Sequence, residues 1–239
     1  MQLTFLGTRG EIEARTRRHR MHTSLLVSHR GARVMIDCGL DWLSKFERLH
    51  PKAIVLTHAH PDHAWGLKRG ASCPVYAPRK TWQELRHYPI KDRHVIEERT
   101  PTKICGITFE EFPVEHSILS PAVGYRASAG RARIFYAPDL IFIHERAAAL
   151  KRVEIYIGDG ATLTRSFIRR RGKALIGHSP VRTQLTWCEK EGVPEAIITH
   201  CGSKIVTGDE RKISAKLRAM AAERHVEVRI AYDGMKLML

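Results

Sequence analysis

Short apolar runs alternate with turns and with helical patterns along the 239 residues of the chain. Runs rich in β-branched and aromatic residues, bounded by Gly, Pro or Asp, predict β-strands. The predicted strands are QLTFLG (2–7), SLLVSH (24–29), RVMIDCG (33–39), AIVLTH (53–58), PVYAP (74–78), GITFEEFPV (106–114), AVGYRAS (122–128), ARIFYAPD (132–139), EIYIGDG (154–160), EAIITH (195–200) and VEVRIAYDGMKLML (226–239).

Helical patterns lie between these strands. They cover 63–70, 81–88, 144–152, 181–192 and 209–225. Thr81 and Asp209 are candidate N-caps, and Gly192 is expected to end the fourth helix. The first part of the chain has mainly predicted strands, and in the later part predicted strands alternate with helices. This order predicts an α/β fold of two β-rich layers covered by helices. The length favours one domain over residues 1–239.

Five of the predicted strands end alike, in a His or Asp beside small or turn residues. These residues are Asp37, His58, Asp139, Asp159 and His200, and His116 follows its strand in the same manner. The carboxyl ends of strands in a layered sheet point to one rim, so such groups can converge in space. Imidazole and carboxylate are donors that Zn²⁺ and Mn²⁺ accept. The pattern therefore predicts a metal site at one edge of the sheets.

The densest group of such residues is HAHPDH (58–63), directly after an apolar run. His58 and His60 are two residues apart, so in an extended backbone both side chains point the same way and can bind one ion. Pro61 then turns the chain, and the adjacent Asp62 and His63 suit a second ion. This spacing favours a two-metal site with ions ~3.5–4 Å apart.

HAHPDH resembles the H-x-H-x-D-H signature of the metallo-β-lactamase superfamily. Four further motifs resemble those of the family in the same order: IDCG at Asp37, VEHS at His116, YAPD at Asp139 and ITHCG at His200. The resemblance implies a four-layer αββα sandwich that binds two divalent metal ions, Zn²⁺ or Mn²⁺. It assigns His58, His60 and His116 to the first ion. It assigns Asp62, His63 and His200 to the second ion, with Asp139 between the two ions.

The motif GHS at His178 looks like that of the ribonuclease Z branch and of the cyclic phosphodiesterase of the carbon–phosphorus lyase pathway. In that branch the matching histidine helps to protonate the leaving group, so His178 is a candidate general acid. The alternative is that it only holds another side chain in place. The interval between His116 and Asp139 is too short for the arm with which ribonuclease Z binds transfer RNA. The resemblance therefore does not imply transfer RNA as the substrate of this chain.

We therefore expect a binuclear phosphodiesterase in which a hydroxide bridging the two ions attacks phosphorus. Asp62 is a candidate both to bind metal and to orient the water. Asp37, Asp159 and His22 are expected to support the ligands, although Asp159 can equally cap a turn and His22 can be an ordinary rim or core histidine. Two alternatives stay open: a lactone, thioester or carboxylic ester hydrolase on the same metals, and a nucleic-acid-binding protein with a vestigial site.

The chain carries 40 Lys and Arg against 25 Asp and Glu, a formal charge of +15. This balance favours a phosphodiester or other anionic substrate, nucleic acid among them. The densest basic runs, RTRRHR (15–20) and RSFIRRRGK (165–173), are expected as loops that edge the site or that are merely solvated. Their arginines suit phosphate because the guanidinium group makes bidentate hydrogen bonds: Arg15, Arg17, Arg18, Arg20, Arg169, Arg170 and Arg171.

No apolar run reaches the ~18 to 20 residues of a membrane span, and the first residues do not resemble a signal peptide. We therefore expect a cytoplasmic protein without a membrane partner. The odd number and wide spacing of the five cysteines argue against a disulfide framework. Homo-oligomers are compatible with the sequence.

Overall fold

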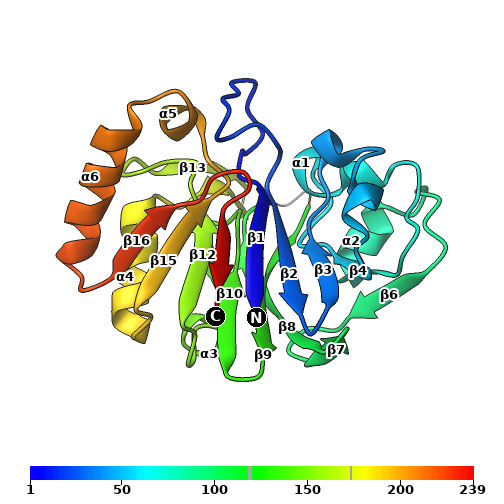
Figure 1. Cartoon of the computed structure of the whole chain (residues 1–239). Helices are drawn as coiled ribbons and strands as arrows, with labels where there is room; N and C mark the ends of the chain where they lie inside the picture. The colour runs from blue at the N-terminus through cyan, green and yellow to red at the C-terminus, as the bar shows by residue number, and fades with distance from the viewer. Residues whose placement is uncertain (118–119, 173) are drawn as a thin grey trace.

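The computed structural model describes residues 1–117, 120–172 and 174–239. Two β-sheets pack face to face, and helices cover their outer faces (Figure 1). The prediction of a layered αββα sandwich is confirmed. Both ends of the chain lie on neighbouring parts of one sheet, where β1 (Gln2–Gly7) pairs with β17 (Lys236–Met238).

The first sheet has the strand order β17-β1-β2-β3-β4-β5-β6. The remaining bounds are β2 Ser24–His29, β3 Ala32–Ile36, β4 Ala53–Val55, β5 Val75–Pro78 and β6 Arg93–Ile96. The pairs from β17 to β3 are antiparallel, and those from β3 to β6 are parallel. The carboxyl ends of β3 and β4 therefore meet at the same edge.

The second sheet has the order β11-β8-β9-β10-β12-β15-β16, and β7 pairs with β8. Its bounds are β7 Thr102–Ile104, β8 Ile107–Glu115, β9 Ala122–Ala129, β10 Ala132–Tyr136, β11 Phe142–Ile143, β12 Ile155–Asp159, β15 Glu195–Thr199 and β16 Glu227–Ile230. A separate antiparallel ribbon consists of β13 (Phe167–Arg171) and β14 (Ala174–His178).

Six α-helices are described, and short 3₁₀ turns cover 40–42, 46–49 and 65–67. The helices are α1 Pro61–Ala64, α2 Arg79–Glu84, α3 Arg146–Ala149, α4 Val181–Glu191, α5 Ser203–Val206 and α6 Glu210–Ala222. Within the described ranges, no helix combines the length and the apolar character that a membrane span requires.

The apolar core has three layers, as the sandwich requires. Side chains of both sheets meet in the central layer, where Val27 packs with Tyr125 and Ile157. The layer under α4 and α6 includes Leu185 and Leu217. The third layer, under α1 and α2, includes Leu67, Trp82 and Ile54. Burial of this apolar surface on both faces of each sheet is the main force that holds the layers together.

The predicted ends of two helices are confirmed. Asp209 caps α6, because its carboxylate accepts hydrogen bonds from the backbone N–H groups of Arg211 and Lys212. Gly192 ends α4 with φ +68°, a left-handed conformation that costs glycine little. Thr81 is not an N-cap: α2 begins at Arg79 after Pro78, and Thr81 is buried inside the helix.

Two predictions about strands are wrong. The run 226–239 is not one strand, because a turn at Gly234, with φ +87°, sends β16 and β17 into different sheets. The arginine-rich run 165–173, expected as a loop, contains strand β13. All six residues from Arg165 to Arg170 are exposed, so this strand lacks the apolar alternation that identifies a half-buried strand.

Candidate metal centre

The first group of candidate ligands lies where β4, β8 and β10 end. His58, His60, His116 and Asp139 each offer one ligand atom, and these atoms lie within 4.8 Å of one another. His116 Nε2 is 3.2 Å from His60 Nδ1, and His58 Nε2 is 3.7 Å from Asp139 Oδ2. Two atoms that share a tetrahedral ion, each ~2.1 Å from it, are ~3.4 Å apart. The separations in this group suit one divalent ion.

The second group consists of Asp62, His63 and His200, whose ligand atoms also lie within 4.8 Å of one another. Asp62 Oδ2 is 3.0 Å from His200 Nε2 and 3.2 Å from His63 Nε2. The Oδ2 atom of Asp139 lies 3.7 Å from His200 Nε2 and 3.9 Å from His63 Nε2. The same carboxylate oxygen therefore lies beside both groups.

The burial of these nitrogens tests whether the residues fit metal ions. His58 and His63 have no exposed surface, and their Nε2 atoms have no hydrogen-bond partner among the described residues. A buried polar atom without a partner costs free energy, so such atoms are rare in folded proteins. A divalent cation at each ligand group would satisfy the nitrogen that belongs to that group, so the residues fit metal ions on this observation.

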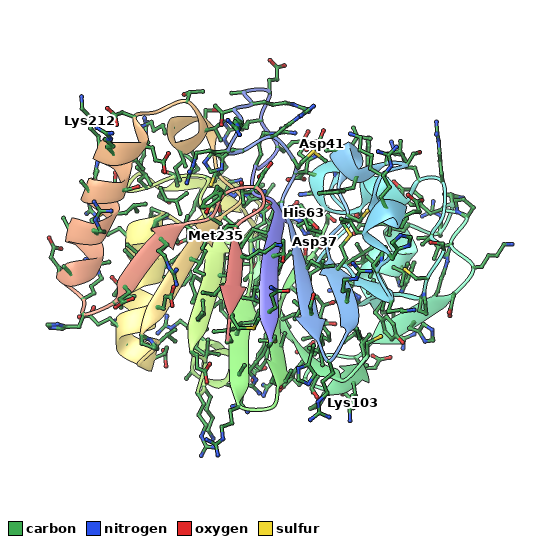
Figure 2. The ribbon with its side chains drawn as sticks, in the orientation of Figure 1. Asp37, Asp41, His63, Lys103, Lys212 and Met235 are labelled. Atoms are coloured by element: carbon green, nitrogen blue, oxygen red, sulfur yellow. The ribbon has the colours of Figure 1, made fainter. Side chains whose placement is uncertain are left out.

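Asp37, at the end of β3, holds the neighbouring histidines from behind. His63 Nδ1 donates to Asp37 Oδ2 over 2.9 Å, which leaves His63 Nε2 facing the group of ligands. Figure 2 labels these two residues close together, Asp37 directly after β3 and His63 in α1. The backbone N–H and hydroxyl of Thr57 also donate to Asp37, and Thr57 Oγ1 lies 3.0 Å from His58 Nδ1. This network fixes which nitrogen of each ring faces the site.

Asp159, at the end of β12, contacts histidines of the site from the second sheet, as Asp37 does from the first. His178 Nδ1 donates to Asp159 Oδ2 over 2.8 Å, and His200 Nδ1 lies 3.6 Å from Asp159 Oδ1. Gln184 of α4 fixes Asp159 through bonds to its backbone N–H and carbonyl, 2.9 and 2.8 Å long. Gln184 was not among the residues predicted from the sequence, although a glutamine on the apolar face of a helix is a signal.

The carboxylates control the protonation of the histidines. Burial alone would lower the pKa of His178, but Asp159 and Asp139 raise it to about 11. In the same way Asp62 and Asp37 outweigh burial and raise the pKa of His63 to about 10. The opposite holds for His60, where burial and the neighbouring His116 lower the pKa to about 4. The two carboxylates therefore favour the protonated form of His178, whereas burial favours the neutral form of His60, which can bind a metal ion.

A cavity of about 400 Å³ opens onto both ligand groups. Its walls include Glu11 and Ile12 from the loop after β1, and Ile176, Gly177 and His178 from β14. Burial and the nearby carboxylate of Asp62 raise the pKa of Glu11. Glu11 was not predicted from the sequence, because a single glutamate in a loop carries no sequence signal.

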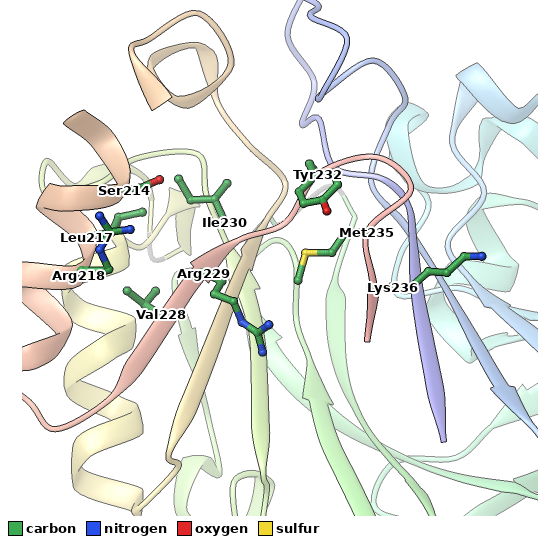
Figure 3. Close-up of a pocket in the computed structure, with 9 residues that line it drawn as sticks. All are labelled: Ser214, Leu217, Arg218, Val228, Arg229, Ile230, Tyr232, Met235 and Lys236. Carbon is green, nitrogen blue, oxygen red and sulfur yellow. The ribbon is translucent and has the colours of Figure 1, made fainter. Parts of the chain in front are cut away.

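Another cavity, of about 300 Å³, lies between α6, β16 and β17 (Figure 3). None of its nine lining residues is a candidate metal ligand. One of its arginines, Arg229, is paired with Glu195. This second cavity is therefore separate from the candidate ligands.

Residues 32–201 match the β-lactamase superfamily domain. The chain belongs to this superfamily. A curated relative is ribonuclease Z of Methanococcus maripaludis, 31% identical over 153 residues, a match that covers 52% of this chain and 48% of that protein. The chain thus matches about half the length of this relative. The match supports the ribonuclease Z branch that the GHS motif indicated.

Two solved structures share the fold of this superfamily member over almost its whole length. The metallo-β-lactamase fold protein YhfI from Bacillus subtilis has a TM-score of 0.76 and 15% identity, over 99% of this chain and 98% of that one. A diphosphatase of the PhnP family has a TM-score of 0.72 and 22% identity, over 100% and 97%. Both likenesses concern the fold.

The arginines of the run 15–20 do not line the cavity that opens onto the ligand groups. Arg15 forms an ion pair with Asp41, and Arg18 forms one with Glu210 while covering the ring of Tyr232. The side chains of Arg17 and Arg20 are exposed. Ion pairing therefore explains two of these four arginines without a substrate.

The other sequence candidates lie at the rim or on the ribbon. His22 is buried, its Nδ1 accepts a hydrogen bond from the backbone of Asp41, and its Nε2 is 3.9 Å from Glu11. Burial and then Arg9 lower the pKa of His22 to about 4. Arg169 and Arg170 are exposed on β13, and the side chain of Arg171 lies outside the described part of the chain.

Proposed function

We propose that this protein is a phosphodiesterase that works with two divalent metal ions, Zn²⁺ or Mn²⁺. His58, His60 and His116 would hold one ion, Asp62, His63 and His200 the other, and Asp139 would contact both. The observation that carries the proposal is the position of Asp139 Oδ2, 3.7 Å from His58 Nε2 and 3.7 Å from His200 Nε2. Such a pair of ions, when bound, lowers the pKa of water and neutralises charge on a phosphoryl group.

We infer that Asp62 orients the attacking water. It lines the cavity, and although burial raises the pKa of a carboxyl group, His63 and His200 hold the pKa of Asp62 well below its ordinary value. An ionised carboxylate accepts a hydrogen bond and can take a proton from water. We therefore assign Asp62 two tasks, as a ligand and as the group that aligns the water.

His178 is proposed as the general acid. Its ring lines the cavity with 26% of the side chain exposed, while Nδ1 is held by Asp159 and lies 3.0 Å from Asp139 Oδ1. The two carboxylates keep the ring protonated and fix its direction, so its other nitrogen can donate to the leaving oxygen. The formal charge of +15 and the ribonuclease Z relative support a phosphodiester as the substrate.

Two measurements on the purified protein test this function. We expect two ions per chain by metal analysis, and faster hydrolysis of bis(p-nitrophenyl) phosphate than of a lactone after loading with Zn²⁺ or Mn²⁺. Much faster turnover of the lactone would replace the phosphodiesterase with a lactone or thioester hydrolase. Less than one ion per chain, with no activity after metal addition, would favour a nucleic-acid-binding protein with a vestigial site.

A matched pair of histidine variants supplies the control. His58→Ala removes a fully buried candidate ligand, and we expect it to lose metal and activity. His94→Ala removes an exposed histidine whose partner is Asp92, so this variant should keep both ions and the activity. Equal metal content and activity in the two variants would contradict the proposed site.

A further inference from the structure

The register of the β13–β14 ribbon divides its exposed side chains between two faces. Phe167 pairs with His178, and Arg169 pairs with Ile176. Residues directly opposite each other in an antiparallel pair have their side chains on one face, and successive residues alternate between faces. His178 and Ile176 both line the cavity of the metal centre.

Phe167 and Arg169 therefore continue the cavity face of the ribbon. Ile168 and Arg170, which pair with Gly177 and Leu175, lie on the opposite face. From the sequence alone, the arginines of this run are equivalent candidates for phosphate binding. The register separates Arg169 from Arg170.

The cavity face of the ribbon carries groups that suit a polyanion with flat, apolar parts. Phe167 is 44% exposed, although a large apolar side chain is usually buried. Among the described residues, neither Arg169 nor Arg170 forms an ion pair, in contrast to Arg15 and Arg18, which have acidic partners. An exposed aromatic ring beside an unpaired guanidinium is the combination with which proteins bind stacked bases and phosphates.

The base of the ribbon is fixed to the metal centre. The backbone N–H of Gly177 donates to the carbonyl of His116 over 3.1 Å, and His116 Nδ1 lies 3.2 Å from the carbonyl oxygen of Gly177. Gly177 has φ +137°, and a Cβ there would lie 1.7 Å from the carbonyl oxygen of Phe167. These contacts hold Phe167 and Arg169 in one place relative to a candidate metal ligand.

We propose that this face of the ribbon binds a single-stranded nucleic acid whose phosphodiester occupies the cavity. One base stacks on Phe167, and the phosphate of a neighbouring nucleotide contacts Arg169. A single strand is required, because a paired base cannot offer its face to a side chain. Phe167 and Arg169 are two residues apart, roughly 6.6 Å along the strand, so neighbouring nucleotide units can contact both. The net charge of +15 favours the same ligand.

This inference rests on the proposed phosphodiesterase, and the experiment separates the two. Phe167→Ala and Arg169→Ala change the cavity face, and Ile168→Ala and Arg170→Ala are matched controls on the opposite face of the same strand. Each metal-loaded variant is tested for cleavage of single-stranded RNA and DNA oligonucleotides and for hydrolysis of bis(p-nitrophenyl) phosphate. The ratio of the two rates corrects for changes in folding or metal content. Binding is measured by the fluorescence anisotropy of a labelled phosphorothioate strand, which resists cleavage.

We expect Phe167→Ala to weaken binding about tenfold or more and to lower the ratio of oligonucleotide to small-diester cleavage similarly, since stacking on an aromatic side chain is worth about 1–3 kcal/mol per base. Arg169→Ala should weaken binding and make it less dependent on salt, by about one counterion. Ile168→Ala should bind as the wild type does, and Arg170→Ala should lose less than Arg169→Ala.

Equal losses on both faces, no loss on either face, or equal affinity for duplex and single strand would overturn the proposed binding face. If the cavity-face variants lose affinity for only RNA or only DNA, this result supports the proposed binding face and identifies the nucleic acid. If the wild type does not hydrolyse bis(p-nitrophenyl) phosphate or any oligonucleotide, the phosphodiesterase fails instead, and the anisotropy comparison still decides whether the ribbon binds a single strand.

Discussion

His178 Nδ1 and Asp159 Oδ2 are joined by a hydrogen bond of 2.8 Å at the wall of the cavity. The bond uses one ring nitrogen of His178, and 26% of the side chain stays exposed at the cavity. The proposed role as a general acid uses both features, because the carboxylate favours the protonated ring and the exposed face can approach a substrate. The ligand atom of His178 also lies within 4.8 Å of those of Asp139, Asp159 and His200, so the metal content of a His178 variant is part of the test.

The first prediction is that His178→Ala lowers kcat and leaves the metal content unchanged. We expect a decrease in kcat of about 10²–10⁴-fold, the usual contribution of a positioned proton donor. The decrease in kcat should be smaller for a diester with a p-nitrophenolate leaving group than for one with an alkoxide leaving group. The p-nitrophenolate is the weaker base, so its departure depends less on proton donation by an acid. Loss of metal from this variant, or an equal decrease for both substrates, would show that the histidine is only structural.

The second prediction concerns Asp37, which accepts the Nδ1 proton of His63. Without this acceptor, the ring of His63 can rotate or change tautomer, so Asp37→Ala should lower the affinity for the second ion about 10–100-fold. Titration of the metal-free protein with Zn²⁺, followed by calorimetry, measures this change. Asp92→Ala, which removes an exposed carboxylate bound to His94, is the control and should titrate like the wild type.

The fold could be predicted because its strands are regular and bury one or both faces. Asp37, His58 and His200 follow apolar runs that form strands, and the ends of those strands meet at one edge. Local chemistry therefore indicated which residues come together. The same reasoning missed β6 and β7, because β6 is exposed at three of its four residues and β7 has only three residues.

The rest of the site depends on tertiary structure. Phe167 and Arg169 were recognisable as part of a basic run, but only the register with β14 separates them from Ile168 and Arg170. Gln184 was visible as a polar residue in a helix, yet its bonds to Asp159 exist only because α4 packs against β12. Glu11 reaches the cavity through the path of a loop, which no periodic pattern describes.

The third prediction is a pH dependence of stability that comes from Glu111. Glu111 is buried in β8, and its Oε2 has no hydrogen-bond partner among the described residues. Burial, and then the nearby Glu98 and Glu97, raise its pKa from an ordinary 4.5 to about 8. Between these values the folded protein binds this proton more tightly than the unfolded chain does, so the free energy of unfolding falls as pH rises through that window.

Glu111→Gln removes this dependence. At pH 9 the variant should exceed the wild type in free energy of unfolding by roughly 2 kcal/mol or more, since a tenfold change in proton affinity is worth about 1.4 kcal/mol. Below pH 4.5 the difference should vanish. Urea unfolding at pH 4, 6, 8 and 9 measures it, and Glu154→Gln, at an exposed site, should follow the wild type. A variant that is less stable at pH 9 would contradict the assignment.

The fourth prediction concerns Gly177, which connects the ribbon to the metal centre. A Cβ at this position would lie 1.7 Å from the carbonyl oxygen of Phe167, and the backbone has φ +137°. Gly177→Ala must therefore shift β14, and with it both His178 and the carbonyl that accepts from His116. We expect hydrolysis of bis(p-nitrophenyl) phosphate to fall at least tenfold.

Gly172→Ala, at the turn of the same ribbon, is the matched control. Gly172 also has a positive φ, +63°, but a Cβ there would meet no atom of the described residues within 4 Å. This variant should lose only the ~1 kcal/mol of backbone strain that alanine suffers in a left-handed conformation and should keep its activity. Parallel thermal unfolding curves and diester assays separate strain from displacement of the site. Similar activity in the two variants would mean that the position of the ribbon does not affect catalysis, and that His178 reaches the substrate without the constraint at Gly177.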